Sequence, residues 1–242
     1  MKSSLSKYLL LTLIVFCTFQ TGCEDIGSSP NTNKYTYYDD ISDITYLNSS
    51  FYTTNYDLSG NAGEQIDLIV YNIVDTETVM NNKFSLGLNG QGYLSITNDG
   101  NDLFLQSRSN YNIFKISNTG EIAYLSSDTL NTKWLPSGLT YNSSNDSLVF
   151  LYRNPEKNNQ YRLREVSKLL SEQSKNDREF VLNGLDTTVY GALCIAYKEP
   201  NLYVLAFDGQ EDVLITMDYS SLNLISNESV NDSTAVGIDI VN

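Results

Sequence analysis

Two kinds of hydrophobic pattern divide this chain of 242 residues. One continuous apolar run covers residues 8–19, whereas from about residue 40 onward the apolar residues stand in short stretches that alternate with polar ones. Such alternation is typical of half-buried β-strands. The stretches are separated by turns rich in Asn, Ser and Gly, residues that tolerate tight or left-handed backbone. The pattern therefore predicts an all-β domain over most of the chain.

The β-rich part contains an internal repeat. Each copy reads as a strand, a short polar turn and a second strand, and the copies cover residues 42–56, 92–105, 137–152 and 191–205. The equivalent positions stand 44 to 56 residues apart and are occupied by Tyr46, Thr97, Tyr141 and Tyr197. Each copy predicts a β-hairpin, and a period of this length is typical of repeat architectures.

Two further strands follow each hairpin. Third strands are predicted at residues 66–73, 111–117, 161–166 and 213–219, and weaker fourth strands at 83–86, 122–126, 179–182 and 222–226. Four antiparallel strands per repeat resemble a β-propeller blade, and the resemblance covers roughly residues 40–242. It implies an all-β, β-propeller-like domain of four to five repeats whose blades stack on one another. A β-sandwich is the alternative.

The C-terminal end of the repeat array admits three arrangements. Residues 235–241 read as the first strand of a fifth repeat, after which the sequence stops. This strand could close the ring by pairing with an N-terminal strand at residues 34–38. Alternatively, four full blades close the ring by themselves, or an incomplete edge remains that could dimerise. We expect a small closed ring.

The N-terminus resembles a bacterial lipoprotein signal. Lys2 and Lys7 precede the apolar run, which at about 12 residues is shorter than the roughly 20 that span a bilayer. Residues 21–23, Thr-Gly-Cys, match the end of a lipobox, although Gln20 departs from its usual aliphatic residue. The resemblance implies that residues 1–22 are removed and that Cys23 carries the lipid. A plain signal peptide and an uncleaved membrane anchor are the alternatives.

Lipid attachment at Cys23 would place the protein in the bacterial cell envelope, at the outer membrane or the cell surface. Several acyl chains anchor firmly, because each buried CH₂ contributes about 0.8 kcal/mol. The polar residues 23–33 read as a flexible tether to a domain at residues 34–242. Glu24 and Asp25 are candidate sorting residues beside the lipid. Of the three cysteines, Cys17 would leave with the signal, so Cys194 could form no intrachain disulfide.

Composition excludes several chemistries. The sequence has no histidine, which rules out Ser-His-Asp and Cys-His nucleophile systems and histidine-containing zinc sites. We therefore expect no metal and no cofactor. The net charge of −14 would repel nucleic acid, because phosphate binding needs clustered Lys and Arg.

A basic segment at residues 153–179 stands out on this acidic chain. Its candidate binding patch, for an acidic partner, a polysaccharide or a lipid headgroup, consists of Arg153, Lys157, Arg162 and Arg164. Within the segment, residues 165–175 contain helix formers and predict a short inserted helix. The alternative is a solvated insertion whose charges pair with one another, for example Glu165 with Lys168.

Other candidate sites have simpler explanations. The oxygen-rich stretches 98–102 and 208–212 could hold calcium but are better explained as turns. Tyr35, Tyr37 and Tyr38 could form a sugar-stacking platform or an edge strand. Among 29 acidic residues no spacing singles out a catalytic pair. We therefore expect a membrane-anchored envelope lipoprotein that displays a β-propeller-like domain for protein or glycan binding. The alternatives are a histidine-free, glycan-active propeller enzyme using Asp and Glu, and a structural envelope component without a small ligand.

Overall fold

The structure is a computed structural model with sixteen strands in the part of the chain that it describes. That part comprises residues 41–55, 66–74, 77–88, 94–107, 111–117, 121–127, 134–157, 159–169, 176–183, 192–207, 210 and 212–230. The strands are β1 (Ile41–Leu47), β2 (Ser50–Asn55), β3 (Asp67–Val74), β4 (Glu77–Ser85), β5 (Leu94–Asn98), β6 (Leu103–Ser107), β7 (Asn112–Ile116), β8 (Ile122–Ser127), β9 (Leu135–Asn142), β10 (Ser147–Arg153), β11 (Gln160–Ser167), β12 (Asn176–Val181), β13 (Ala192–Lys198), β14 (Asn201–Phe207), β15 (Asp212–Asp218) and β16 (Leu224–Val230).

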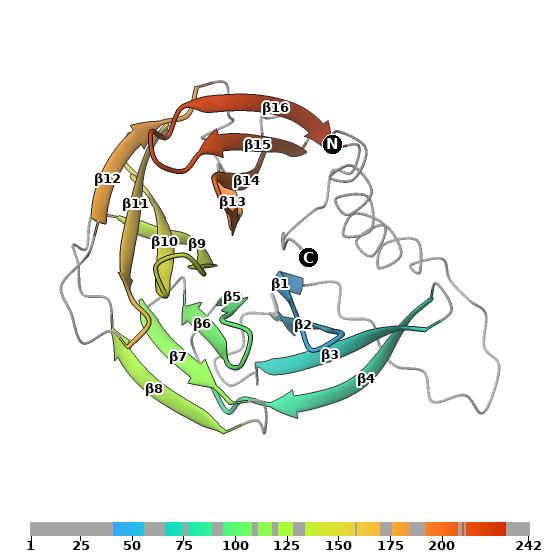
Figure 1. Ribbon diagram of the computed structural model, residues 1–242. Helices are drawn as coiled ribbons and strands as arrows, with labels where there is room; N and C mark the ends of the chain where they lie inside the picture. The colour runs from blue at the N-terminus through green and yellow to red at the C-terminus, as the bar shows by residue number, and fades with distance from the viewer. Residues whose placement is uncertain are drawn as a thin grey trace.

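The strands form four separate antiparallel sheets, each a meander of four consecutive strands. We call the sheets blades 1 to 4, blade 1 being β1–β4 and blade 4 being β13–β16. They stand around a common axis, with β1, β5, β9 and β13 innermost and β4, β8, β12 and β16 outermost (Figure 1). The chain is thus a four-bladed β-propeller. The prediction of four-stranded repeats is confirmed, and the β-sandwich is excluded.

An apolar cluster fills each junction between neighbouring blades. One cluster joins blades 1 and 2, a second blades 2 and 3, and a third blades 3 and 4. The fourth contains Ile44 and Phe51 of blade 1 together with Cys194 and Leu205 of blade 4. Because a fully buried Leu, Ile or Phe contributes about 1.5–3 kcal/mol, these junctions hold the blades in one ring.

Neighbouring blades are also linked through equivalent positions of their innermost strands. The side-chain amide of Asn98 in blade 2 donates to Thr45 Oγ1 in blade 1 at 2.7 Å. The backbone N–H of Tyr197 in blade 4 donates to Thr140 Oγ1 in blade 3 at 3.0 Å. The two threonines occupy the same place in their repeats, and each accepts a hydrogen bond from the blade that follows.

Two expectations about the local structure are wrong. Residues 165–167 belong to strand β11 and residues 168–169 form a turn, so no helix begins at Glu165. Strand β11 alternates half-buried and buried side chains from Gln160 to Glu165 and is paired on both sides, by β10 and β12, which outweighs its helix propensity. The outermost strands are also longer than predicted, β4 beginning at Glu77 rather than at Lys83.

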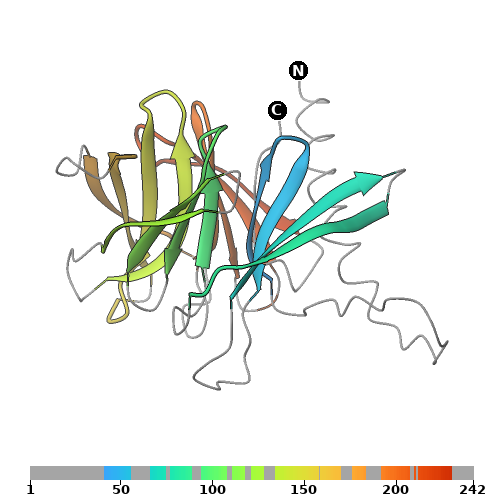
Figure 2. The ribbon, with the colours of Figure 1, turned by 90° about the horizontal axis from the view of Figure 1, so that it is seen from below.

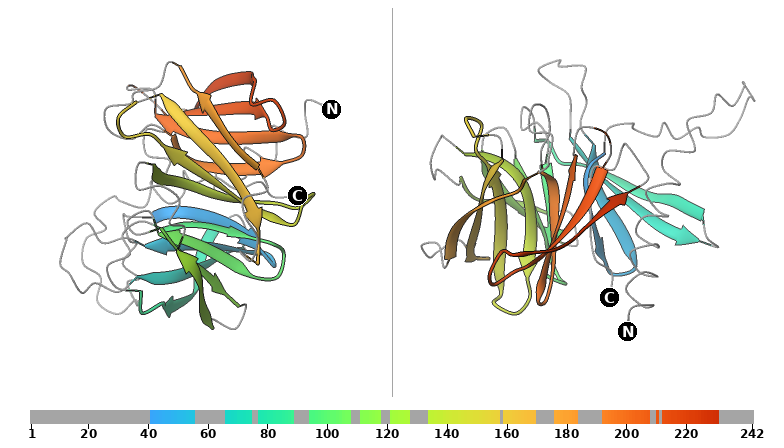
Figure 3. Two further views of the ribbon diagram at one scale, coloured as in Figure 1. Left: turned by 90° about the vertical axis from the view of Figure 1, so that its left-hand side faces the viewer. Right: turned by 90° about the horizontal axis from the view of Figure 1, so that it is seen from above.

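Several predicted features lie outside the described residues: the signal at 1–22, the tether at 23–33 with Cys23, Glu24 and Asp25, the tyrosines at 35–38, residues 170–175, and the strand at 235–241. Among the residues that are described, no helix is long and apolar enough to cross a membrane. The turns that join the first two strands of each blade gather at one end of the ring (Figures 2 and 3). We call this the hairpin end.

Candidate functional site

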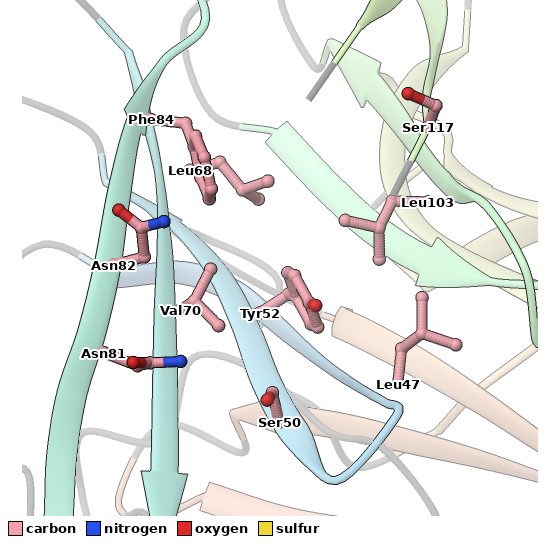
Figure 4. A pocket seen from close by; sticks show the side chains of 10 residues that line it. All are labelled: Leu47, Ser50, Tyr52, Leu68, Val70, Asn81, Asn82, Phe84, Leu103 and Ser117. Atoms are coloured by element: carbon pink, nitrogen blue, oxygen red, sulfur yellow. The ribbon is translucent and has the colours of Figure 1, made fainter. Parts of the chain in front are cut away.

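A pocket of about 160 Å³ lies between blades 1 and 2 near the hairpin end (Figure 4). Most of the described residues that line it come from blade 1, and blade 2 contributes two. Its apolar part consists of the side chains of Leu47, Leu68, Val70, Leu103 and the ring of Phe84. Its polar part consists of Ser50, Asn81, Asn82 and Ser117, and Tyr52 contributes both a ring and a hydroxyl. The described lining therefore contains no charged side chain.

A β-bulge in β4 places the two asparagines side by side on this pocket. Val70 pairs with Asn82 and the next residue, Tyr71, pairs with Met80, so Asn81 is an extra residue without an opposite partner. In a regular strand consecutive side chains alternate between faces, whereas a bulge re-aims one of them. Both amides consequently line the same hollow (Figure 4).

Hydrogen bonds already orient several of the polar groups. Ser50 Oγ donates to Asn72 Oδ1 at 2.7 Å, and Ser117 Oγ accepts from the backbone N–H of Glu121 at 3.1 Å. The Oδ1 atom of Asn82 accepts from the backbone N–H of Lys83 at 2.8 Å. This contact leaves the NH₂ group and a second lone pair of Oδ1 as the parts of the Asn82 amide that a ligand can use.

A second polar cluster is built around Glu165 at the junction of blades 3 and 4. Glu165 is 3% exposed, and its Oε1 accepts hydrogen bonds from Ser147 Oγ, from Asn142 Nδ2 at 3.1 Å and from Asn145 Nδ2 at 3.0 Å. Its Oε2 accepts from the hydroxyl of Tyr219, in blade 4, at 2.9 Å. The carboxylate thus binds groups of its own blade through Oε1 and a group of blade 4 through Oε2.

The environment of Glu165 favours its charged form. Burial by itself would raise the pKa of this carboxyl, but the hydrogen bonds from Ser147, Asn145 and Tyr219, with the positive charge of Arg178, lower the pKa below its ordinary value. Burial and the neighbouring charge of Glu165 raise the pKa of Tyr219. The tyrosine therefore stays a hydrogen-bond donor, and the carboxylate serves a structural purpose.

A third cluster links the hairpin turns of blades 2 and 3. Lys168 Nζ lies 3.0 Å from Asp99 Oδ2 and 2.8 Å from Asp146 Oδ1. The hydroxyl of Tyr141 donates to Asp146 at 2.5 Å, and burial together with this hydrogen bond raises the pKa of Tyr141 to about 12. Lys168 therefore links blade 3 to Asp99 of blade 2. It does not form the pair with Glu165 that the sequence had suggested.

The predicted basic patch is divided between the two faces of blade 3. Arg162 stands opposite Tyr152 in the sheet, whereas Arg153 stands opposite Tyr161, and the two tyrosines belong to apolar clusters on opposite faces. Arg164 shares the face of Arg162, because the two are separated by one residue of β11. Lys157 is exposed in the turn after β10.

Arg162 is already engaged within its blade. It forms a two-point ion pair with Asp177, each N–O distance being 2.5 Å, and its guanidinium lies 5.8 Å from the ring centre of Trp134. This pairing matches the self-paired interpretation for Arg162. A binding role for the four basic residues stays a prediction.

Two other residues considered as candidates, Asp99 and Cys194, stabilise the fold. Asp99 Oδ1 accepts the backbone N–H groups of Asn101 and Asp102, each at 2.9 Å, as an aspartate-stabilised turn does. Cys194 is buried in the junction of blades 4 and 1. Among the described residues, no three side chains of His, Cys, Asp and Glu come together as a metal site would require.

The sequence pattern by itself does not predict the pocket. Its signal was the Asn-Asn pair at positions 81 and 82, which a regular outer strand would split between two faces. Only the pairing register shows that both side chains lie on one face.

No protein-family model and no curated protein sequence matches the chain. Solved structures do resemble it. A glutaminyl cyclase from Myxococcus xanthus has a TM-score of 0.50 and 12% identity over 83% of this chain and 70% of its own. Virginiamycin B lyase from Staphylococcus aureus has a TM-score of 0.44 and 19% identity, over 87% and 61%. Hydrazine synthase from Kuenenia stuttgartiensis has a TM-score of 0.46 and 12% identity, over 84% and 53%. At these identities the likeness concerns the fold alone.

Proposed function

We propose that this protein is a lipid-anchored lipoprotein of the bacterial cell envelope whose β-propeller binds a ligand. The observation that carries the binding role is the pocket between blades 1 and 2, where neutral polar groups and apolar side chains meet in one hollow. A concave site with an apolar lining and a few placed polar groups is the usual form of a small-ligand site.

The binding role has more support than glycan cleavage. A glycosidase places two carboxyl groups on either side of the bond that it breaks. The described lining of the pocket contains no carboxylate. Two of the buried carboxylates, Asp43 and Glu165, are hydrogen-bonded at blade junctions, Asp43 to the backbone N–H groups of Ile44 and Ile96. The two carboxylates stabilise the ring. Because their oxygens already accept hydrogen bonds from the protein, they are poorly suited to transfer a proton to a glycan.

The membrane anchor rests on the sequence around Cys23. A basic start, a short apolar run and Thr-Gly-Cys are the order of a lipoprotein signal, and the polar residues 24–33 provide a tether. Anchored in this way at the outer membrane or the cell surface, the propeller would bind its ligand from a fixed position on the envelope.

Metabolic labelling tests the anchor. Cells that express the full chain are grown with a radiolabelled fatty acid, and the protein is isolated by precipitation. The wild type and a Cys194→Ala variant should carry the label, because Cys194 is buried in the propeller, whereas Cys23→Ala should not. Label in the Cys23→Ala variant, or absence of label in the wild type, would refute the anchor.

A further inference from the structure

The pocket between blades 1 and 2 has two chemically different sides. Its apolar side consists of aliphatic side chains and the rings of Tyr52 and Phe84, of which Phe84 is 36% exposed. Its polar side consists of the amides of Asn81 and Asn82 and the hydroxyls of Ser50 and Ser117. A ligand that satisfies both sides must itself have an apolar face and a rim of hydrogen-bonding groups. A sugar ring, with C–H bonds on its faces and hydroxyls on its edge, has this form.

The two asparagines suit hydroxyl groups better than charged groups. A primary amide offers both donors and an acceptor, so it can serve a hydroxyl that needs both. In Asn82 the Nδ2 group offers two donors, and Oδ1, which accepts the N–H of Lys83, has a second lone pair for a further donor. Because the bulge brings Asn81 beside Asn82, the pair could contact two neighbouring hydroxyls of one ring.

Charge argues against an ionic ligand. The described lining has no Lys or Arg to hold an anion and no Asp or Glu to hold a cation. The nearest basic residue along β4, Lys83, forms an ion pair with Asp67 at 2.6 Å. The net charge of −14 further disfavours anions. The ligand class is therefore neutral.

Size limits the part of the ligand that the pocket holds to about one ring. The pocket volume is about 160 Å³, and an engineered cavity of about 150 Å³ in another protein holds a single benzene. One six-membered ring therefore fits, while further units of an oligosaccharide would extend into solvent.

Blade 4 offers an internal comparison. Its outermost strand has a bulge at the equivalent place, between Leu224 and Ser226, but the extra residue there is Ile225, which is 57% exposed. Blades 1 and 4 thus share the bulge, whereas β11 and β12 of blade 3 pair without one. The pair of amides belongs to blade 1.

From these observations we propose that the pocket is a binding subsite for one neutral sugar ring of a glycan, with Asn81 and Asn82 as hydrogen-bonding residues and Tyr52 and Phe84 as the aromatic wall. The inference deepens the proposed binding function by naming its ligand class. It does not depend on the anchor, so a failure of fatty-acid labelling at Cys23 would leave it standing.

Ligand-observed saturation-transfer NMR tests this subsite. The full chain, in a detergent without a sugar headgroup, is titrated with the methyl glycosides of glucose, galactose, mannose and N-acetylglucosamine. Methyl glucuronide serves as the anionic probe and N-acetylphenylalanine amide as the apolar probe. At least one neutral glycoside should bind saturably and weakly. Asn81→Ala and Asn82→Ala should each weaken it about 5- to 10-fold, the loss expected for one hydrogen bond.

Asn227→Ala is the matched control, because Asn227 is an exposed asparagine on the outermost strand of blade 4. It should bind as the wild type does, and thermal unfolding should show that all three variants are folded. The proposal is overturned if no neutral glycoside binds, if only the anionic or the apolar probe binds, or if both pocket variants bind with unchanged affinity.

Discussion

Replacement of Glu165 by Gln should weaken the junction between blades 3 and 4. The carboxylate accepts four hydrogen bonds, three from its own blade and one from Tyr219 of blade 4. A bond to a charged acceptor contributes about 1.5–3 kcal/mol against about 0.5–1.5 kcal/mol for a neutral one. Loss of the charge could therefore cost about 4–6 kcal/mol, most of which the easier burial of a neutral amide offsets. We expect a net loss of about 1–3 kcal/mol at neutral pH, out of the total of about 5–15 kcal/mol typical of a domain.

The effect should depend on pH with a definite sign. Because the folded protein lowers the pKa of Glu165, the charged form contributes stability above the ordinary glutamate pKa, about 4.3. That contribution is lost as the pH falls through the lower pKa of the folded state. The Glu165→Gln variant has no such charge, so this contribution to its stability does not change with pH. The difference in stability between wild type and Glu165→Gln should therefore be largest at neutral pH and shrink below about pH 4.

Urea unfolding measures this difference. The single tryptophan, Trp134, is buried between blades 2 and 3, so its fluorescence reports loss of the ring. Glu228→Gln is the control, because Glu228 is exposed on β16. It should unfold as the wild type does at neutral pH. Equal stability of Glu165→Gln and wild type at neutral pH, or a difference that stays constant with pH, would refute a buried, charged carboxylate at this junction.

Two other positions yield predictions at different junctions. A Cβ atom at Gly138 would lie 3.0 Å from the backbone nitrogen of Ile195 and 3.2 Å from Cys194 Cα. Gly138→Ala should therefore lower the free energy of unfolding by about 1–3 kcal/mol. An unchanged urea midpoint would contradict this close approach of β9 and β13. Lys168→Met removes the ion pairs to Asp99 and Asp146 and should cost about 1 kcal/mol at low salt and less at high salt, because the charges of Lys168 and Asp146 are partly exposed. Thermal unfolding at two salt concentrations measures it, and a loss that does not change with salt would speak against an electrostatic cause.

Much of the fold could be predicted from local sequence signals. Alternating apolar residues and Asn-rich turns predicted the hairpins, and the repeat predicted four strands per blade. The prediction of a helix from Glu165 was wrong. Helix propensity reflects residues that are neighbours in the sequence, whereas β11 is stabilised by hydrogen bonds to the strands on both sides of it, β10 and β12. Because β11 is a strand at a blade junction, the side chain of Glu165 is buried and hydrogen-bonded there instead of exposed on a surface helix.

The candidate pocket could not be predicted from the sequence. It requires the offset in pairing between β3 and β4, which brings Asn81 and Asn82 to one face, and the approach of Leu103 and Ser117 from the next blade. Pairs such as Glu165 and Tyr219 are separated by 54 residues and meet only because the blades stack.

By itself, the sequence determined the type of structure and the four strands of each repeat, and it predicts a lipoprotein-like start that ends at Cys23, because alternation, turn preference and signal motifs depend on residues close together in the chain. Only the tertiary structure decided which faces pack, which charges are buried and where a hollow remains. Those properties depend on strand register and on the stacking of one blade against the next, and no short stretch of sequence contains that information.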